Sequence, residues 1–168
     1  MTEYFEAFDD DDAPLGLVPR DVVHARGLWH RSAHIFVFAA DGRMLIQRRA
    51  ADKDLYAGCW DLAVGEHLQP GETYAAGAAR GLLEELGIRA EPVPVGALVR
   101  NEWVSDGACD REIQQAFVLH YDGPLKVDPV EVAEVRHIAP DDLSRWMAAE
   151  PEAFTPWFRS EMARLGMP

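Results

Sequence analysis

The stretch between Gly65 and Ile88 constrains the fold of this 168-residue chain more than any other segment. Apolar residues recur in it with the period of an amphipathic helix, and this pattern predicts a helix over residues 73–86. Thr73 suits the N-cap of that helix, and Gly87 suits the left-handed position that ends many helices. The apolar stripe consists of Ala75, Ala78, Ala79, Leu82 and Leu86. Because alanine side chains are small, we expect this helix to lie close against a sheet.

The segments on either side alternate between strand and helix patterns. Strands are predicted over residues 33–38, 43–49, 60–64, 93–104, 112–121 and 135–138, and further helices over residues 140–149 and 156–165. This order predicts an α/β (α+β) fold, an α/β/α sandwich around a mixed β-sheet, with residues 1–168 as a single domain. Residues 1–14 contain an acidic run, and we expect them to be a flexible acidic tail.

The formal net charge of −13 restricts the partners of the chain. A general binder of nucleic acid or of anionic membranes would need a basic face, so we expect neither partner. A phosphorylated small molecule remains compatible with an acidic site, because divalent cations bind carboxylates and phosphates together. The chain has no run of 18 apolar residues, no signal-peptide pattern and only two cysteines, Cys59 and Cys109, so we expect a cytoplasmic protein. A homodimer stays open.

Four charged residues carry the chemistry of the central stretch. Glu72 lies in the loop that enters the predicted helix, and Arg80, Glu84 and Glu85 lie on the helix. Arg80 and Glu84 are one turn apart, so they can pair, while adjacent Glu84 and Glu85 can flank a cation at the helix edge. Mg²⁺ prefers such oxygen ligands and, bound to a diphosphate, neutralises its charge and orients an attacking water.

The spacing resembles the Nudix box: a Gly, five residues, a Glu, seven residues, then Arg-Glu-x-x-Glu-Glu-x-Gly and an aliphatic residue. Glu72, Arg80, Glu84 and Glu85 match it, as do Gly87 and Ile88 at its end. The resemblance implies a Nudix fold and Mg²⁺-dependent cleavage of a diphosphate, with Mn²⁺ as a second candidate metal. Two positions depart from the box. The opening Gly is Glu66, and the Glu that should follow Arg80 is Gly81.

The departures fit the branch of the family that resembles isopentenyl-diphosphate isomerase, whose box lacks that second Glu. This resemblance runs from about His24 to Trp157 and implies a metal site of histidines and carboxylates. Its implied metal ligands are His67, His30, Asp110 and Glu112, with His24 one residue away from a third histidine position, and Glu85 at a second metal. It also implies that Arg49 and Lys53 contact the diphosphate and that Trp157 lines the pocket.

Gly65 separates this chain from the isomerases, which need a Cys at that position to move a proton on carbon. Glycine cannot transfer a proton, so hydrolysis is the first hypothesis. In it, Glu84 and Glu85, with Glu72, hold Mg²⁺, while Arg49 and Lys53 bind phosphate oxygens. Further roles follow: Arg80 orients Glu72 or Glu84, and the attacking water is activated by the metal or by a carboxylate such as Glu112. An isomerase of altered mechanism and a diphosphate-binding module without catalysis are the alternatives.

Overall fold

The computed structural model describes residues 2–53, 55–105 and 108–167 of the chain. Its strands are β1 (Tyr4–Phe8), β2 (Pro14–Pro19), β3 (Trp29–Phe38), β4 (Met44–Arg49), β5 (Trp60–Asp61), β6 (Val64–His67), β7 (Val93–Ser105), β8 (Ala108–His120) and β9 (Val132–Ile138). Its helices are α1 (Arg20–Arg26), α2 (Tyr74–Leu86), α3 (Pro140–Ala149), the short 3₁₀ helix η1 (Pro151–Ala153) and α4 (Pro156–Leu165). Among these helices, none is long and apolar enough to cross a membrane.

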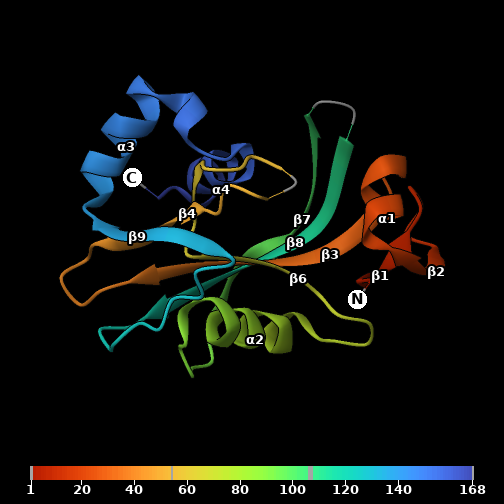
Figure 1. Ribbon diagram of the computed structural model, residues 1–168, viewed down its shortest axis with the longest axis horizontal. Helices are drawn as coiled ribbons and strands as arrows, with labels where there is room; N and C mark the ends of the chain where they lie inside the picture. Colours follow the sequence, from red (N-terminus) through yellow and green to blue (C-terminus); the bar gives the residue numbers. More distant parts are fainter. Residues whose placement is uncertain (1, 54, 106–107, 168) are drawn as a thin grey trace.

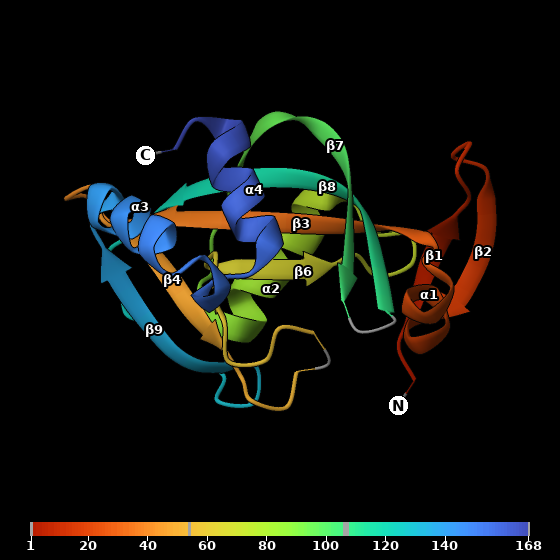
Figure 2. The ribbon, with the colours of Figure 1, turned by 90° about the horizontal axis from the view of Figure 1, so that it is seen from above.

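The described strands form one mixed sheet with β3 at its centre. Strand β3 pairs in parallel with β8 and antiparallel with β1, β4 and β6, and β9 and β7 extend the sheet beyond β4 and β8. Helix α2 covers one face, while α3 and α4 cover the other (Figure 1). Seen from above, α1 lies beside β1 and β2 at one end of the sheet (Figure 2). The predicted α/β/α sandwich with a mixed sheet is therefore confirmed.

The two faces of β3 explain why both helical layers pack on it. Ile35 and Val37 belong to the core cluster under α2, with Leu82 and Leu86 of that helix. Phe36, between them in sequence, belongs to the opposite cluster with residues of α3 and α4. Successive side chains on a strand point to opposite faces, so a strand buried on both sides becomes a continuous apolar run.

Helix α2 begins and ends where the sequence predicts. The Thr73 side-chain oxygen accepts a hydrogen bond from the Ala76 backbone N–H at 3.2 Å. Gly87 adopts the left-handed conformation with a φ of 69°, as expected of a helix-terminating glycine. These caps fix where the charged residues of α2 lie relative to the loop before it.

The N-terminal segment corrects an expectation. Residues 1–14 were expected to form a flexible tail, but Tyr4–Phe8 pairs with Pro14–Pro19 in a hairpin. The acidic run forms its turn, where an Asp9 carboxylate oxygen accepts hydrogen bonds from the backbone N–H groups of Asp11 and Ala13. Phe5 is 2% exposed, and its ring stacks on His30 at 5.1 Å between centroids. Phe5 thus anchors the hairpin to the rest of the chain.

Candidate metal and diphosphate site

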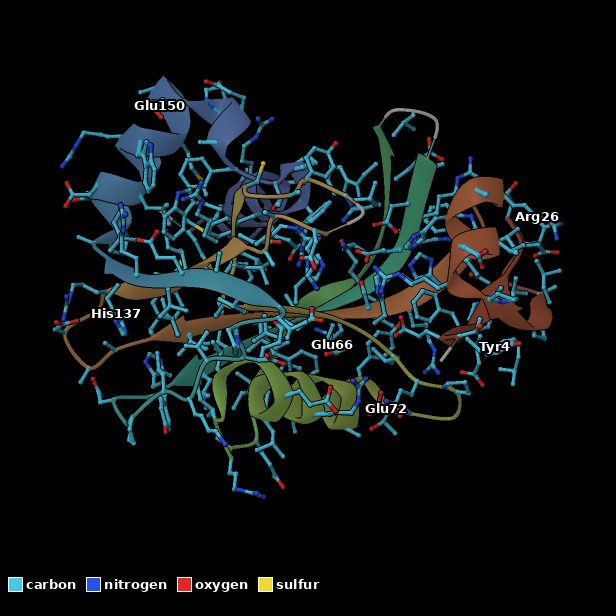
Figure 3. The ribbon with its side chains drawn as sticks, viewed as in Figure 1. Tyr4, Arg26, Glu66, Glu72, His137 and Glu150 are labelled. Carbon is cyan, nitrogen blue, oxygen red and sulfur yellow. The ribbon has the colours of Figure 1, made fainter. Side chains whose placement is uncertain are left out.

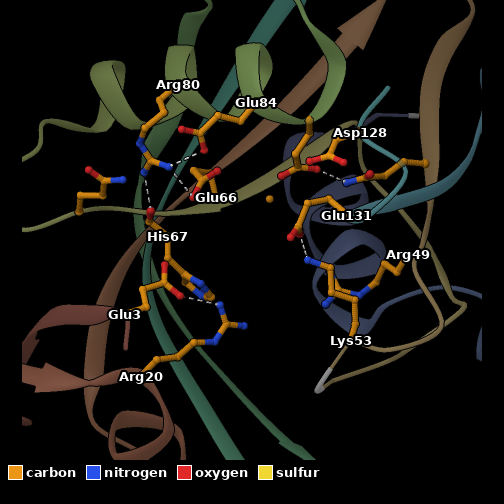
Figure 4. A pocket seen from close by; sticks show the side chains of 14 residues that line it. Glu3, Arg20, Arg49, Lys53, Glu66, His67, Arg80, Glu84, Asp128 and Glu131 are labelled. Carbon is orange, nitrogen blue, oxygen red and sulfur yellow. Dashed lines mark hydrogen bonds and ion pairs between the residues drawn. The ribbon is translucent and has the colours of Figure 1, made fainter. Parts of the chain in front are cut away.

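A cavity of about 420 Å³ opens beside α2 and the sheet, and charged side chains line it (Figure 4). Helix α2 contributes Arg80, Glu84 and Glu85, and β6 contributes Glu66 and His67. Arg49 and Lys53 line the same cavity, together with Arg20, Glu3, Asp128 and Glu131. The larger cavity shares Arg20, Arg49, Gly65 and His67 with a smaller hollow that also reaches Asp110, Glu112 and Trp157. The predicted box residues Arg80, Glu84 and Glu85 thus line a space that adjoins the hollow reached by His67, Asp110 and Glu112, whereas Glu72 and His30 line neither.

Arg80 organises the carboxylates of the box. Its Nε and Nη2 atoms donate to the two oxygens of Glu72 at 3.0 and 2.8 Å, and its Nη1 lies 3.2 Å from Glu84 and 3.0 Å from Glu66. Partial burial disfavours the charge of Glu72, but the Arg80 hydrogen bonds and the Gln69 backbone N–H hold its pKa below the ordinary value. Both oxygens of Glu72 are therefore occupied by Arg80. Figure 3 shows Glu66 and Glu72 close to α2.

Glu85 lies deeper in the same wall. Its side chain accepts a hydrogen bond from the Gln47 amide at 2.9 Å, and the residue is 8% exposed. Burial, with repulsion from Glu66, raises the pKa of Glu85 to about 8, and burial also raises the pKa of Glu66. Carboxylates held in a low-dielectric wall ionise readily only beside a compensating cation. A divalent cation with oxygen ligands fits this donor set.

The histidine cluster is formed by four different elements. His24 comes from α1, His30 from β3, His67 from β6 and Asp110 from β8, and one ligand atom from each lies within 4.8 Å of all the others. His30 Nε2 is 3.3 Å and His24 Nε2 is 3.9 Å from the same Asp110 oxygen. The predicted ligands His30, His67 and Asp110 therefore meet. His24 joins them although its sequence spacing is one residue off.

The state of His30 favours metal binding. Its Nδ1 donates to the Leu28 carbonyl at 3.1 Å, so in the neutral ring Nε2 carries the lone pair. Burial and the neighbouring His67 lower the pKa of His30 to about 3, which keeps the ring neutral. Among the described residues, His30 Nε2 and the facing Asp110 oxygen are buried without a hydrogen-bond partner. Buried polar atoms of this kind require an explanation, and a cation between them supplies one.

Glu112 lies beside this cluster and braces two histidines. One of its oxygens is 3.1 Å from His67 Nε2, and the other is 3.4 Å from His34 Nε2. Burial opposes its charge, but the hydrogen bonds to His34 and His67 keep the pKa of Glu112 well below the ordinary value. Burial, with repulsion from Glu112, raises the pKa of Asp110 to about 7. His34 is 2% exposed, and its contact holds Glu112 in place.

Asp61 anchors the residues expected to contact the substrate, and sequence reasoning missed it. Its carboxylate accepts hydrogen bonds from Thr155 Oγ1 and Trp157 Nε1, both at 2.9 Å, and from Arg49 Nη1 at 3.2 Å. The Arg49 guanidinium also lies 5.2 Å from the centroid of the Trp157 ring. Lys53 forms an ion pair with Glu131 across the larger cavity. Arg49 and Lys53 thus line the larger cavity, and Arg49 and Trp157 line the smaller hollow.

Gly65 leaves open space at the position where the resemblance to the isomerases implies a Cys. A Cβ atom built at Gly65 would meet no described atom within 4 Å, although the residue lines both cavities. Cys59 and Cys109 lie outside the residues that line these two cavities. The part of the chain that the structure describes therefore offers no thiol at this point.

Comparison with known proteins identifies the family. The NUDIX domain matches residues 28–158. An isopentenyl-diphosphate Delta-isomerase of Burkholderia multivorans is 38% identical over 168 residues, covering 100% of this chain and 96% of the relative. An uncharacterized Nudix hydrolase of Pseudomonas aeruginosa is 39% identical over 135 residues, covering 79% and 76%. A solved structure from Deinococcus radiodurans shares the fold with a TM-score of 0.75 at 22% identity, covering 97% and 99%. The chain therefore belongs to the Nudix family.

Proposed function

We propose that this chain is a Mg²⁺-dependent hydrolase that cleaves the diphosphate linkage of a small molecule, with Mn²⁺ as an alternative metal. The observation that carries the proposal is the cavity in which the box carboxylates face Arg49 and Lys53. Anionic and cationic walls in one cavity suit a metal-bound diphosphate, because the metal takes the carboxylates while the cations take phosphate oxygens. Nucleoside diphosphates, nucleotide sugars, dinucleotides and isoprenoid diphosphates remain candidate substrates.

The metal neutralises phosphate charge and lowers the pKa of a bound water. Glu84 and Glu85, which line the cavity, would hold it, while Glu72 is committed to Arg80 and serves as the brace of α2. The histidine cluster would hold a second ion, since imidazole and carboxylate donors suit Mn²⁺ or Zn²⁺. Arg49 and Lys53 would bind the phosphate that leaves.

The proton of the attacking water needs an acceptor among the carboxylates. Glu112 has the lowered pKa described above, and both of its oxygens face histidines, so it is a weak base and a strong anchor for His67. Glu84 lines the open cavity with its side chain 56% exposed. We therefore assign a positioning role to Glu112, and we propose that Glu84, besides holding the metal, would accept the proton of the attacking water.

A panel of diphosphate compounds tests the proposal. Release of phosphate and nucleotide is measured with Mg²⁺, Mn²⁺ or chelator for the wild type, Glu84→Gln and the control Glu152→Gln, whose exposed carboxylate lies outside the cavity. Loss of a general base lowers turnover by about 10²–10⁴-fold. Metal-dependent release that Glu84→Gln abolishes and Glu152→Gln keeps is the expected result. No release from any compound, with metal and diphosphate still bound, would favour the binding module.

An isoprenoid-diphosphate isomerase is the second candidate, because several relatives carry that name and the histidine cluster matches the implied isomerase site. Gly65 weighs against it, since the proton would have to reach carbon without a thiol at that position. Incubation of isopentenyl diphosphate in D₂O separates the two candidates. Deuterium on carbon without phosphate release would establish the isomerase.

A further inference from the structure

We propose that Glu66 gives the divalent-cation site the carboxylate that the Nudix box normally places at position 81. The proposal rests on the metal-dependent function proposed above and adds a ligand that the box does not contain. In sequence, the two departures from the box look like separate losses, a Gly replaced by Glu66 and a Glu replaced by Gly81. In space, they are one exchange between adjoining positions.

The contact between the two positions is close. A Cβ atom built at Gly81 would lie 3.0 Å from both the Cβ and a carboxylate oxygen of Glu66, and 2.9 Å from Val64 Cγ1. The Val64 contact is shorter than real Cβ atoms show, and Glu66 would have to move by a few tenths of an ångström, so a side chain at position 81 and the Glu66 side chain compete for the same space. Glycine inside a helix costs about 1 kcal/mol relative to alanine. The need to admit the Glu66 carboxylate gives Gly81 a reason to be there.

The Glu66 carboxylate also lies at the larger cavity, where the metal is proposed to bind. It lines the larger cavity with Glu84 and Glu85, and Figure 4 shows it beside Arg80. One of its oxygens is held by Arg80 at 3.0 Å, and the other lies beside Gly81. Strand β6 carries Glu66 in register with Ala33 of the central strand, so its backbone is fixed by the sheet. A donor on a rigid element is held in place before the ion arrives.

Several carboxylates crowd this wall, and a cation would relieve their mutual repulsion. Arg80 is shared among Glu66, Glu72 and Glu84, so one guanidinium faces three carboxylates, and Glu85 adds a fourth. Lys53 favours the charged form of Glu85 through its positive charge, but Lys53 is itself paired with Glu131. An uncompensated group of partly buried carboxylates is costly, whereas Mg²⁺ or Mn²⁺ takes several carboxylate oxygens. Glu66, Glu84 and Glu85 therefore form the ligand set of this site.

Titration with Mn²⁺, followed by electron paramagnetic resonance, tests the proposal on the full chain without substrate. The spectrum of free Mn²⁺ gives the number of bound ions and their Kd values. Loss of a group that supports a metal lowers affinity by about 10–100-fold, and we expect at least this loss for Glu66→Gln at one class of site. Glu91→Gln removes one exposed carboxylate outside the cavity and should bind Mn²⁺ as the wild type does. The class of Mn²⁺ site that Glu66→Gln retains should be the histidine cluster, and His30→Ala should abolish binding at that class.

Exchange of the two residues gives a second test. Gly81→Glu alone should lower the melting temperature, because its side chain meets Glu66 and Val64. Adding Glu66→Gly should recover part of that stability, and the double variant should bind Mn²⁺ more tightly than Glu66→Gln does, since one carboxylate is returned to the same space. Wild-type affinity in Glu66→Gln would overturn the role of Glu66 and leave the proposed hydrolase intact. A wild-type chain that binds Mn²⁺ only at the histidines would overturn both.

Discussion

Replacement of Asp61 by Asn should be among the most destabilising single changes near the site. Asp61 is 1% exposed, and its carboxylate accepts from Thr155, Trp157, Arg49 and its neighbour's backbone N–H at 2.9–3.2 Å. Asn removes the charge opposite Arg49 and turns an amide N–H toward one of these donors. Breaking a buried ion pair costs about 3–5 kcal/mol, and Arg49 keeps its hydrogen bonds to the Leu55 carbonyl. We therefore expect a loss of about 3 kcal/mol.

Urea denaturation followed by tryptophan fluorescence measures this loss. With a slope of about 2 kcal/mol per molar urea, the midpoint should fall by about 1.5 M. The matched control is Asp41→Asn, because Asp41 is exposed and its ion pair with Arg43 lies at the surface. The urea midpoint of this variant should match that of the wild type. A loss below about 1 kcal/mol for Asp61→Asn would refute the view that this carboxylate holds Arg49 and Trp157 together.

Three further predictions concern protons, space and metal. The folded-state pKa of Glu85 is raised to about 8. In metal-free protein its contribution to stability is therefore present below its unfolded pKa of about 4.3 and is lost as pH rises through about 8. The free energy of unfolding, measured from pH 5 to 9, should fall less steeply in Glu85→Gln than in the wild type, and equal slopes would contradict the raised pKa. Gly65→Cys should fold normally, because a Cβ there meets open space, and should add one fast-reacting thiol in a titration with a disulfide reagent; a slow or absent extra thiol would show that the cavity is closed. His30→Ala should weaken Mn²⁺ binding at the histidine cluster by about 10–100-fold, whereas His137→Ala, at an exposed position of β9, should not.

Local patterns predicted the elements that local interactions stabilise. Helix α2 carries its own cap at Thr73, its own terminator at Gly87 and an apolar stripe, so its limits follow from the sequence. The N-terminal hairpin was not foreseen, because its stability comes from Phe5 packing on His30, 25 residues away in the chain. The single strand predicted over residues 60–64 was wrong, because this segment forms two strands: β5 pairs with β4, and β6 begins only at Val64 and pairs with β3.

In the candidate site, too, features set by one local segment were predicted, and features set by long-range contacts were not. The box residues lie within one segment and were recognised together, as were His67 and His30 through the resemblance. Asp61 binds residues 94 and 96 positions away, and no spacing rule reveals such a contact. The pairing of Glu66 with Gly81 was visible only as two departures, since strand β6 and helix α2 must first pack together to make them neighbours. Long-range contacts therefore account for most of what the sequence did not disclose.

Hydrolysis in a mixture of H₂¹⁸O and D₂O tests the central claim most directly. The wild-type chain is incubated with Mg²⁺ and each diphosphate compound, and the products are read by mass spectrometry and by ³¹P and ²H nuclear magnetic resonance. A hydrolase attacks phosphorus with water, so the account predicts ¹⁸O in a phosphate product, dependent on metal and lost in the double variant Glu84→Gln/Glu85→Gln. Deuterium on carbon with the diphosphate intact, or products that form equally well in that variant, would contradict it.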